Sequence, residues 1–227
     1  ENKKKFEQLI AEAEKKGIKG GKTRSWVFKR FKPSTENADV SDTAYQDGLF
    51  TQTALQQLDD LEKGDKPWFL GVGYQKPHLP FVAPKKYWDL YDRDKIELAA
   101  FQQVSEGTPQ FAYHSFGEIR AFSDIDNKLR IGDKIPEAKQ RELIHGYMAC
   151  ISYIDAQLGK LLDELDRRNI TDKTVIVLWG DHGFHLGDHT EWCKHSNFEQ
   201  ATRIPFMFAG PGVEKNQKSH HPVNLVD

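Results

Sequence analysis

The sequence has 227 residues, of which 38% are hydrophobic, 11% aromatic and 29% charged, and its formal net charge is -2. This apolar content suffices for a packed interior, so the composition excludes a wholly disordered chain and predicts one large domain. The near-neutral charge excludes a general basis for nucleic acid binding, and no run of about 18 apolar residues could span a membrane.

The amino-terminal part of the chain predicts two helices. Residues 2–16 have the apolar spacing of an amphipathic helix whose lysines face water, and glycines break this pattern in residues 17–25. Residues 41–64 predict a second helix, with five apolar residues at helical spacing: Leu49, Phe50, Leu55, Leu58 and Leu61. Because the sequence lacks an initiator methionine and starts inside a predicted helix, we expect its amino terminus to be a cut.

A short apolar run, "PWFLGVGY" (residues 67–74), predicts a buried strand. The prolines of the next segment, "QKPHLPFVAP" (residues 75–84), predict an extended loop outside the sheet. We therefore expect His78 to leave the strand on a stiff loop. Residues 92–135 show no sustained period, and their place after this loop predicts that they shape a substrate pocket.

The longest predicted helix begins at Pro136 and ends near Asn169. Its apolar residues recur at steps of three or four: Leu143, Tyr147, Ile151, Ile154, Leu158, Leu161 and Leu165. Two apolar runs, residues 173–180 and residues 204–210, predict strands. A helix followed by a tight turn, a buried strand and polar residues is typical of an α/β fold, in which ligands bind at the carboxyl ends of strands.

Asp181 and His182 follow the first of these two strands directly. They can offer a carboxylate oxygen and an imidazole nitrogen to one metal ion, and Gly180 and Gly183 permit the sharp turn that this requires. The weaker alternative is a structural zinc site built from His182, His185, His189, Cys193 and His195. It is weaker because the spacing of these residues matches no known zinc finger.

Lys194 lies between Cys193 and His195. A lysine near a metal-bound carboxylate suits an anionic substrate, because it can hold sulfate or phosphate oxygens as a point charge. His78 can act as the acid for a leaving group. The alternative is that these are ordinary surface residues: a lone loop histidine is common, and the nearby Glu199 and Arg203 have the spacing of a helical ion pair.

Taken together, these segments resemble the sulfatase family, and more narrowly its iduronate-2-sulfatase-like branch. The similarity lies in "ENADVSDTAYQDG", in "GVGYQKPHLPFVAPKKYWDLY", and in the stretch from "YMACISYIDAQL" through "VIVLWGDHGFHLGDHTEWCKHSNFEQATRIPFMFAGPGV". It runs from about residue 37 to the end of the sequence. The resemblance implies an α/β fold, an alkaline-phosphatase-like sandwich with a mixed, mostly parallel central sheet flanked by helices.

The resemblance also implies a calcium-dependent hydrolysis of sulfate esters, in which a cysteine converted to formylglycine attacks sulfur. By position, Asp181 and His182 would bind the divalent cation, Ca²⁺. Lys194 and His78 would contact the sulfate and act in catalysis, and His189 is a further candidate for substrate binding. The implied substrate is a sulfated sugar or glycosaminoglycan, and the implied location is periplasmic, secreted or lysosomal.

The sequence departs from the family pattern at the nucleophile. Neither Cys150 nor Cys193 lies in a segment that resembles the family's Cys-x-Pro-Ser-Arg motif, and their unlike contexts predict no disulfide. We therefore expect residues 1–227 to be a partial catalytic domain, inactive alone, without the amino-terminal nucleophile segment and the carboxyl-terminal subdomain. Two alternatives stay open: a phosphodiesterase or phosphonate hydrolase of the same superfamily, and a non-enzymatic metal-binding module.

Overall fold

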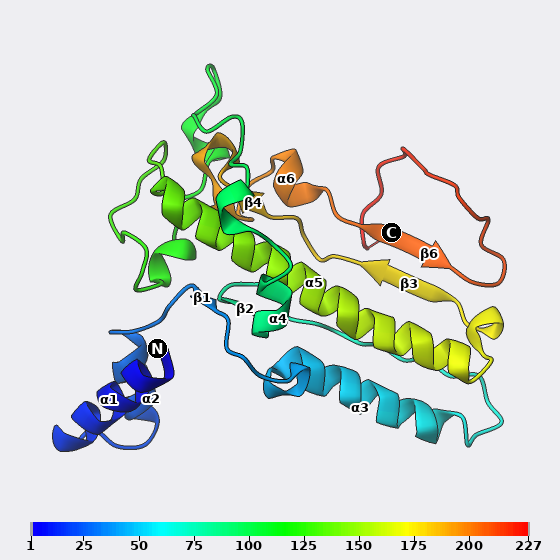
Figure 1. Ribbon diagram of the computed structural model, residues 1–227. Helices are drawn as coiled ribbons and strands as arrows, with labels where there is room; N and C mark the ends of the chain where they lie inside the picture. Colours follow the sequence, from blue (N-terminus) through cyan, green and yellow to red (C-terminus); the bar gives the residue numbers. More distant parts are fainter. Residues whose placement is uncertain (1, 227) are drawn as a thin grey trace.

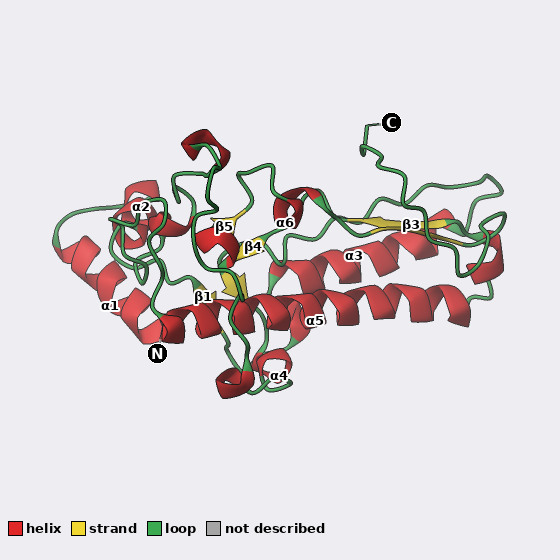
Figure 2. Cartoon of the chain, turned by 90° about the horizontal axis from the view of Figure 1, so that it is seen from above, coloured by secondary structure: helices red, strands yellow, loops and turns green. Residues whose placement is uncertain are grey.

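A long helix, α5 (Glu137–Arg167), runs through the middle of the molecule, and the other elements lie around it (Figure 1). The computed structural model describes residues 2–226. Seen from above, α3 lies alongside the carboxyl-terminal half of α5 (Figure 2). The remaining helices and strands are α1 (Asn2–Lys15), α2 (Gly21–Phe28), β1 (Thr35–Glu36), α3 (Gln46–Leu61), β2 (Phe81–Val82), α4 (Lys85–Trp88), β3 (Ile176–Trp179), β4 (His185–Leu186), β5 (Trp192–Cys193), α6 (Glu199–Thr202) and β6 (Phe206–Ala209).

Helix α5 confirms the predicted long helix and begins directly after Pro136, whose fixed φ and missing N–H suit the entry to a helix. Its buried residues include Leu143, Gly146, Cys150, Tyr153 and Gln157. Ile151 is 45% exposed, so its place in the predicted apolar stripe does not bring it into the core. The buried face turns toward Tyr153 and Gln157 because both side chains bond to Asp42.

Asp42, in the single 3-10 turn that precedes α3, joins this turn to α4 and α5. The Tyr153 hydroxyl donates to the Asp42 carbonyl over 2.8 Å and accepts from the Gly48 N–H over 2.7 Å. The Asp42 carboxylate binds the ammonium groups of Lys160 at 2.6 Å and Lys86 at 2.8 Å. Burial by itself raises the pKa of this carboxyl, but the two lysines outweigh burial and hold the pKa well below its usual range.

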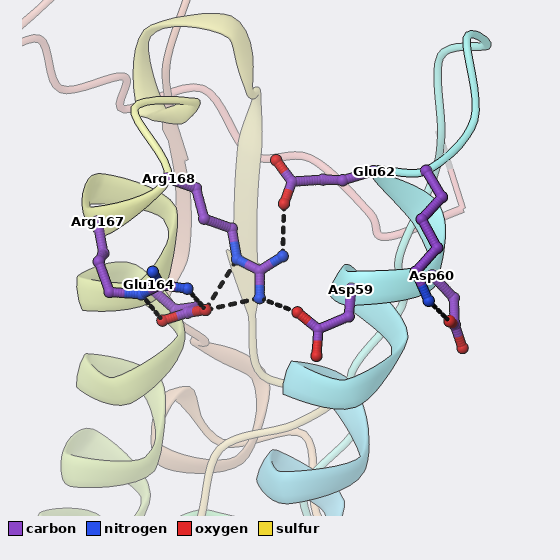
Figure 3. Close-up of polar contacts among 7 residues, drawn as sticks. Asp59, Asp60, Glu62, Glu164, Arg167 and Arg168 are labelled. Carbon is purple, nitrogen blue, oxygen red and sulfur yellow. Dashed lines mark hydrogen bonds and ion pairs between the residues drawn. The ribbon is translucent and has the colours of Figure 1, made fainter.

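An arginine holds the other end of the α3 and α5 pair (Figure 3). The Arg168 guanidinium lies 2.6 Å from both Asp59 and Glu164 and also contacts Glu62. The Arg168 side chain is only 9% exposed, so these contacts form at the helix junction rather than in open solvent. Since the start of α3 meets the middle of α5 and the end of α3 meets the end of α5, the two helices run in the same direction.

The strands among residues 2–226 form three two-stranded sheets. β1 and β2 are parallel, whereas β3 pairs with β6 and β4 pairs with β5 in antiparallel fashion. The strands predicted at residues 173–180 and 204–210 are confirmed as β3 and β6, but the prediction that the first is buried is wrong: Trp179 is 53% exposed, and every residue of its partner β6 is exposed. The α/β class is therefore confirmed, but the described residues do not join into one mostly parallel central sheet.

The predicted buried strand at residues 67–74 is wrong. The segment pairs with no strand among the described residues, and Phe69 is 90% exposed. Its side chains alternate between half-buried and exposed, because one side lies against the molecule and the other faces outward. The loop that follows does not stay wholly outside the sheets either, since Phe81 donates its N–H to the Ser34 carbonyl over 2.7 Å and begins β2.

The predicted first helix is confirmed as α1, with its lysines exposed, and the second is confirmed as α3. Helix α2 was not predicted, because the glycines before it indicate a break. Phe6 packs edge-on against Phe28 and Phe31, with ring centroids 5.8 and 5.1 Å apart, and these contacts together with the burial of Val27 offset the low helix propensity of the segment. Within residues 2–226, no helix has the length and apolar character needed to cross a membrane.

Gly48 offers a test of the packing between α3 and α5. A Cβ at this position would lie 2.2 Å from the Asp42 carbonyl oxygen and 2.9 Å from the Tyr153 hydroxyl, so we expect Gly48→Ala to destabilise the protein by about 1–3 kcal/mol. Gly159→Ala in α5 is the matched control: a Cβ there meets nothing within 4 Å, so it should add about 0.5–1 kcal/mol of stability through helix propensity. Urea unfolding of both variants measures the difference, and equal effects would contradict this packing.

Candidate active site

Three side chains from distant parts of the chain meet at one point: His78, Glu118 and Lys194. The Lys194 Nζ lies 3.1 Å from the His78 Nε2 and 2.7 Å from the Glu118 Oε1. The same carboxylate oxygen lies 3.2 Å from the His78 Nε2, so the three groups form a closed triangle. Two residues that the sequence analysis assigned to catalysis are thus neighbours, although 116 positions separate them in the chain.

The loop that carries His78 is anchored by a half-buried lysine, Lys76, and by an aspartate of α3. The N–H groups of Gln75 and Lys76 donate to the Asp47 carboxylate over 2.7 and 3.2 Å. The Lys76 ammonium donates to the carbonyl oxygens of His78 and Pro80 over 2.8 and 2.9 Å, and burial lowers the pKa of this lysine. The predicted stiff loop is confirmed, and these polar contacts add to the stiffness that the prolines provide.

The hydrogen bonds of His78 fix where its ring carries a proton. Its Nδ1 lies 2.6 Å from the Leu79 carbonyl oxygen, and since a carbonyl only accepts, Nδ1 carries a hydrogen. Nε2 is then free to accept from Lys194, or to donate to Glu118 when the ring is protonated. The His78 side chain is 51% exposed, so a substrate can reach this nitrogen.

Lys194 follows β5 in a stretch with unusual backbone conformations. His189, Thr190 and Cys193 have φ values of 54°, 66° and 73°, in the left-handed region where each non-glycine residue costs about 1–3 kcal/mol. Tight packing keeps them there, since Thr190 and Cys193 are both buried. The side chains of Lys194 and Glu118 are each 16% exposed. Burial works to raise the pKa of Glu118, but Lys194, His78 and His195 together outweigh burial and lower that pKa.

Asp181 and His182 lie where the sequence predicts, directly after β3. Gly180 donates its N–H to the Pro205 carbonyl over 3.1 Å, and Gly183 donates to the Ala201 carbonyl over 2.8 Å. A Cβ on Gly183 would lie 2.1 Å from the Gln200 carbonyl oxygen in α6, so only glycine allows this close approach. The Asp-His turn is therefore clamped to the segment that leads into β6.

The Asp-His pair can supply two donors to a cation. The His182 Nδ1 lies 2.7 Å from the Gly183 carbonyl and so carries a hydrogen, which leaves Nε2 free to bind a metal ion. The Asp181 Oδ2 lies 3.7 Å from this Nε2, and its side chain is 85% exposed. Two donors fit one edge of a coordination sphere, but Ca²⁺ takes six to eight oxygen ligands. Residues 2–226 contain no group of three or more His, Cys, Asp or Glu side chains that could hold a metal.

The histidine cluster does not form the zinc site considered from the sequence, because no three of its side chains come together as a metal-binding group within residues 2–226. His185 is buried, and its Nε2 lies 2.8 Å from the Ser196 hydroxyl. The ring of His189 stacks on Phe198 at 4.6 Å between centroids, and its Nδ1 lies 3.0 Å from the Ser105 hydroxyl. These contacts favour a packing role for His189, and its predicted contact with substrate stays a prediction.

The irregular segment 92–135 reaches the site through a buried pair of side chains, His114 and Glu191. The His114 Nδ1 accepts from the Phe116 N–H over 3.0 Å, so its ring hydrogen lies on Nε2, which is 2.7 Å from the Glu191 Oε2. This contact is close but poorly aligned for a hydrogen bond; the His114 backbone N–H also donates to the same oxygen over 3.3 Å. The pair ties the segment that carries Glu118 to the strand before Lys194.

Neither cysteine has the properties of a nucleophile. Cys150 and Cys193 are both buried and free, which confirms the absence of a disulfide between them. Burial raises the pKa of the Cys150 thiol to about 12 and that of the Cys193 thiol further still. A reactive cysteine requires a lowered pKa and access to substrate, which neither thiol has. That neither cysteine is the nucleophile stays a prediction.

Sequence reasoning missed Glu118. It lies in a segment without periodicity, just before a single 3-10 turn, Ile119–Ala121. Phe116 and Ile119, on either side of it, are fully buried. An acidic residue between two large apolar residues was the one available signal, and it did not indicate which basic residues lie opposite.

A protein-family model described as Sulfatase matches residues 5–227. The iduronate 2-sulfatase of Homo sapiens is 40% identical over 177 residues, which cover 77% of this chain and 32% of that protein. The choline-sulfatase of Rhizobium meliloti is 36% identical over 184 residues, which cover 78% of this chain and 34% of that protein. The chain thus spans about a third of the length of these curated relatives.

One similar solved structure is of a protein in complex with its substrate, D-glucosamine-2-N,6-O-disulfate. It matches with a TM-score of 0.62 at 20% sequence identity, over 74% of this chain and 43% of that chain. At this low identity the likeness concerns the fold alone, and it agrees with the α/β class.

Removal of Glu191 tests whether its buried contact holds the irregular segment in place. Glu191→Ala leaves the His114 N–H without its acceptor inside the protein, so we expect a loss of about 3 kcal/mol in the free energy of unfolding. Glu199→Ala is the control, because that side chain is 72% exposed in a long ion pair and should matter by about 0.5 kcal/mol or less. If chemical denaturation finds the two variants equally stable, the buried pair has no such role.

Proposed function

The chain belongs to the sulfatase family, and we propose that it supplies part of the active site of an enzyme that hydrolyses sulfate esters of a sulfated sugar. The observation that carries this proposal is the meeting of Lys194 and His78, whose Nζ and Nε2 atoms lie 3.1 Å apart although they come from distant segments. A cation and an imidazole side by side are the groups that a sulfate ester needs for charge neutralisation and for protonation of its leaving group.

The relatives support the choice of sulfate esters as the substrate class. Two curated relatives carry the names iduronate 2-sulfatase and choline-sulfatase, and the similar solved structure holds a disulfated glucosamine. We propose a sugar sulfate as the substrate because the chain belongs to the sulfatase family and because its Lys194 and His78 suit a sulfate ester. A periplasmic, secreted or lysosomal location is proposed on the same basis.

In the proposed reaction, water and the sulfate ester give an alcohol and hydrogensulfate, and the sulfur–oxygen bond to the alcohol breaks. Lys194 binds a sulfate oxygen, or the bridging oxygen, as a point charge and offsets the negative charge that collects there. His78 gives the proton on Nε2 to the departing alkoxide, while its Nδ1 hydrogen stays on the Leu79 carbonyl. The attacking group is proposed to be a formylglycine outside the residues described.

Asp181 and His182 are the residues that would hold a divalent cation, with further ligands from other groups. When bound, such a cation would withdraw charge from the sulfate oxygens. Asp181 would contribute a carboxylate oxygen, the donor that Ca²⁺ prefers, and His182 would contribute Nε2. The clamp of Gly183 against α6 would keep both donors in place.

The proposed roles of Lys194 and His78 can be tested in the complete gene product. We expect Lys194→Ala and His78→Ala each to lower the rate of sulfate release by about 100-fold or more, as measured by ion chromatography. Lys173→Ala, an exposed lysine, is the control and should leave the rate unchanged. Unchanged sulfate release in both site variants would refute these roles, and a wild-type preference for phosphate or phosphonate esters would refute the proposed substrate class.

The proposed metal site predicts a specific response to calcium. Loss of an outer-sphere partner commonly weakens a metal site by about 10–100-fold, so Asp181→Asn, which removes the negative charge of a direct ligand, should raise the half-saturating calcium concentration at least about tenfold. Isothermal titration of the chelator-treated complete protein with calcium measures this. Asp172→Asn, an exposed aspartate, is the control. Equal calcium affinity in wild type and Asp181→Asn would show that Asp181 is not a ligand.

A further inference from the structure

The Glu118 carboxylate is surrounded by three basic side chains. Its Oε1 contacts both Lys194 and His78, at 2.7 and 3.2 Å. Its Oε2 lies 3.6 Å from the Nδ1 of a third basic side chain, His195, and is buried without a hydrogen-bond partner. One carboxylate therefore faces both residues proposed to act on the substrate.

The backbone around Glu118 is held rigidly, so its position is not that of a mobile surface charge. Phe116 and Ile119 flank it and are both fully buried in the core. The Arg120 N–H donates to the Phe116 carbonyl over 3.0 Å, and the Arg120 guanidinium donates to the Leu129 carbonyl over 3.1 Å. Fixed on both sides, the carboxylate can determine where Lys194 and His78 lie, rather than follow them.

We propose that Glu118 is a positioning residue for sulfate ester cleavage, which holds the His78 Nε2 and the Lys194 Nζ at the leaving-group side of the substrate. This inference rests on the proposed function and deepens it. Glu118 does not itself touch the reacting atoms: it provides the acceptor for the Nε2 hydrogen of protonated His78 and for one hydrogen of Lys194. Both donors are thereby aligned before the substrate binds, which avoids the cost of ordering them in the transition state.

The role in proton transfer follows from the hydrogen-bond pattern of His78. Because Nδ1 donates to the Leu79 carbonyl, only Nε2 can deliver a proton to a departing alkoxide. As the sulfur–oxygen bond breaks, the electron pair stays on the alcohol oxygen, which takes the Nε2 proton, and a water later restores that proton. Without Glu118, Nε2 has the Lys194 ammonium as its polar neighbour, and two positive groups would repel each other.

A structural role alone makes a different prediction from a positioning role. If Glu118 only stabilised the fold, its loss would reduce the cleavage of all substrates by the same factor. If it aligns the acid, its loss should matter most for substrates whose leaving group needs a proton, and least for an activated phenol. The dependence of the rate on the leaving group therefore separates the two roles.

The test measures kcat and KM of the complete gene product on 4-nitrophenyl sulfate, phenyl sulfate and D-glucosamine 6-sulfate. We expect Glu118→Gln, which keeps the size of the side chain but not its charge, to lose about tenfold more in kcat on phenyl or sugar sulfate than on 4-nitrophenyl sulfate. Glu118→Asp, which keeps the charge and shortens the reach, should fall between this variant and the wild type. Glu106→Gln, an exposed glutamate of the same irregular segment, should behave as wild type.

The outcomes separate this inference from the proposed function. Equal losses on all three substrates in both Glu118 variants, or no loss, would overturn the positioning role while leaving the sulfatase proposal intact. Failure of the wild type to release sulfate from any of the three would overturn the proposed function, and the role of Glu118 with it. Thermal unfolding of each variant identifies a folding defect, and Glu118→Asp supplies the comparison if Glu118→Gln does not fold.

Discussion

The packing of other elements against one helix, α5, is the constraint on which the rest of the structure depends. Its buried face meets β2, which follows the His78 loop, and α3, which supplies the aspartate that anchors that loop. Tyr153 and Lys160 of the helix bind Asp42, and Arg168 at its end binds Asp59 in α3 and Glu62 just after α3. Polar contacts with buried partners thus fix the direction of the helices, while apolar burial supplies the attraction.

The candidate site depends on this frame because its groups are all charged or titratable. The interacting atoms of His78, Glu118 and Lys194 lie within 3.2 Å of one another. Bringing them together in a flexible chain would cost conformational entropy, because the backbone of three segments would have to be ordered. Here the ordering is already provided by packing: Phe116 and Ile119 are buried beside Glu118, and Cys193 is buried beside Lys194. The unusual φ of Cys193 fits the same view, since packing maintains a conformation that local sequence disfavours.

Much of the fold could be predicted from local patterns, and the failures share a cause. Helix α5 follows from the helical period of its apolar residues, and strands β3 and β6 follow from short apolar runs. The segment at residues 67–74 has the composition of a buried strand, yet Phe69 is 90% exposed, since a strand needs a partner that composition does not reveal. Helix α2 was missed because the glycines before it indicate a break, and the contact of its Phe28 with Phe6 of another helix cannot be read from the segment alone.

The sequence by itself determined helices α1, α3 and α5, the position of Asp181 and His182 at a strand end, and the motifs that resemble sulfatases. The sequence could determine these features because each depends on the spacing of residues within one segment of the chain. Only the tertiary structure decided that Lys194 meets His78 across 116 residues, and that Glu118 lies between them. No pattern within one segment encodes such a meeting, since it arises from how separate segments pack on α5 and how the buried contact of His114 with Glu191 joins them.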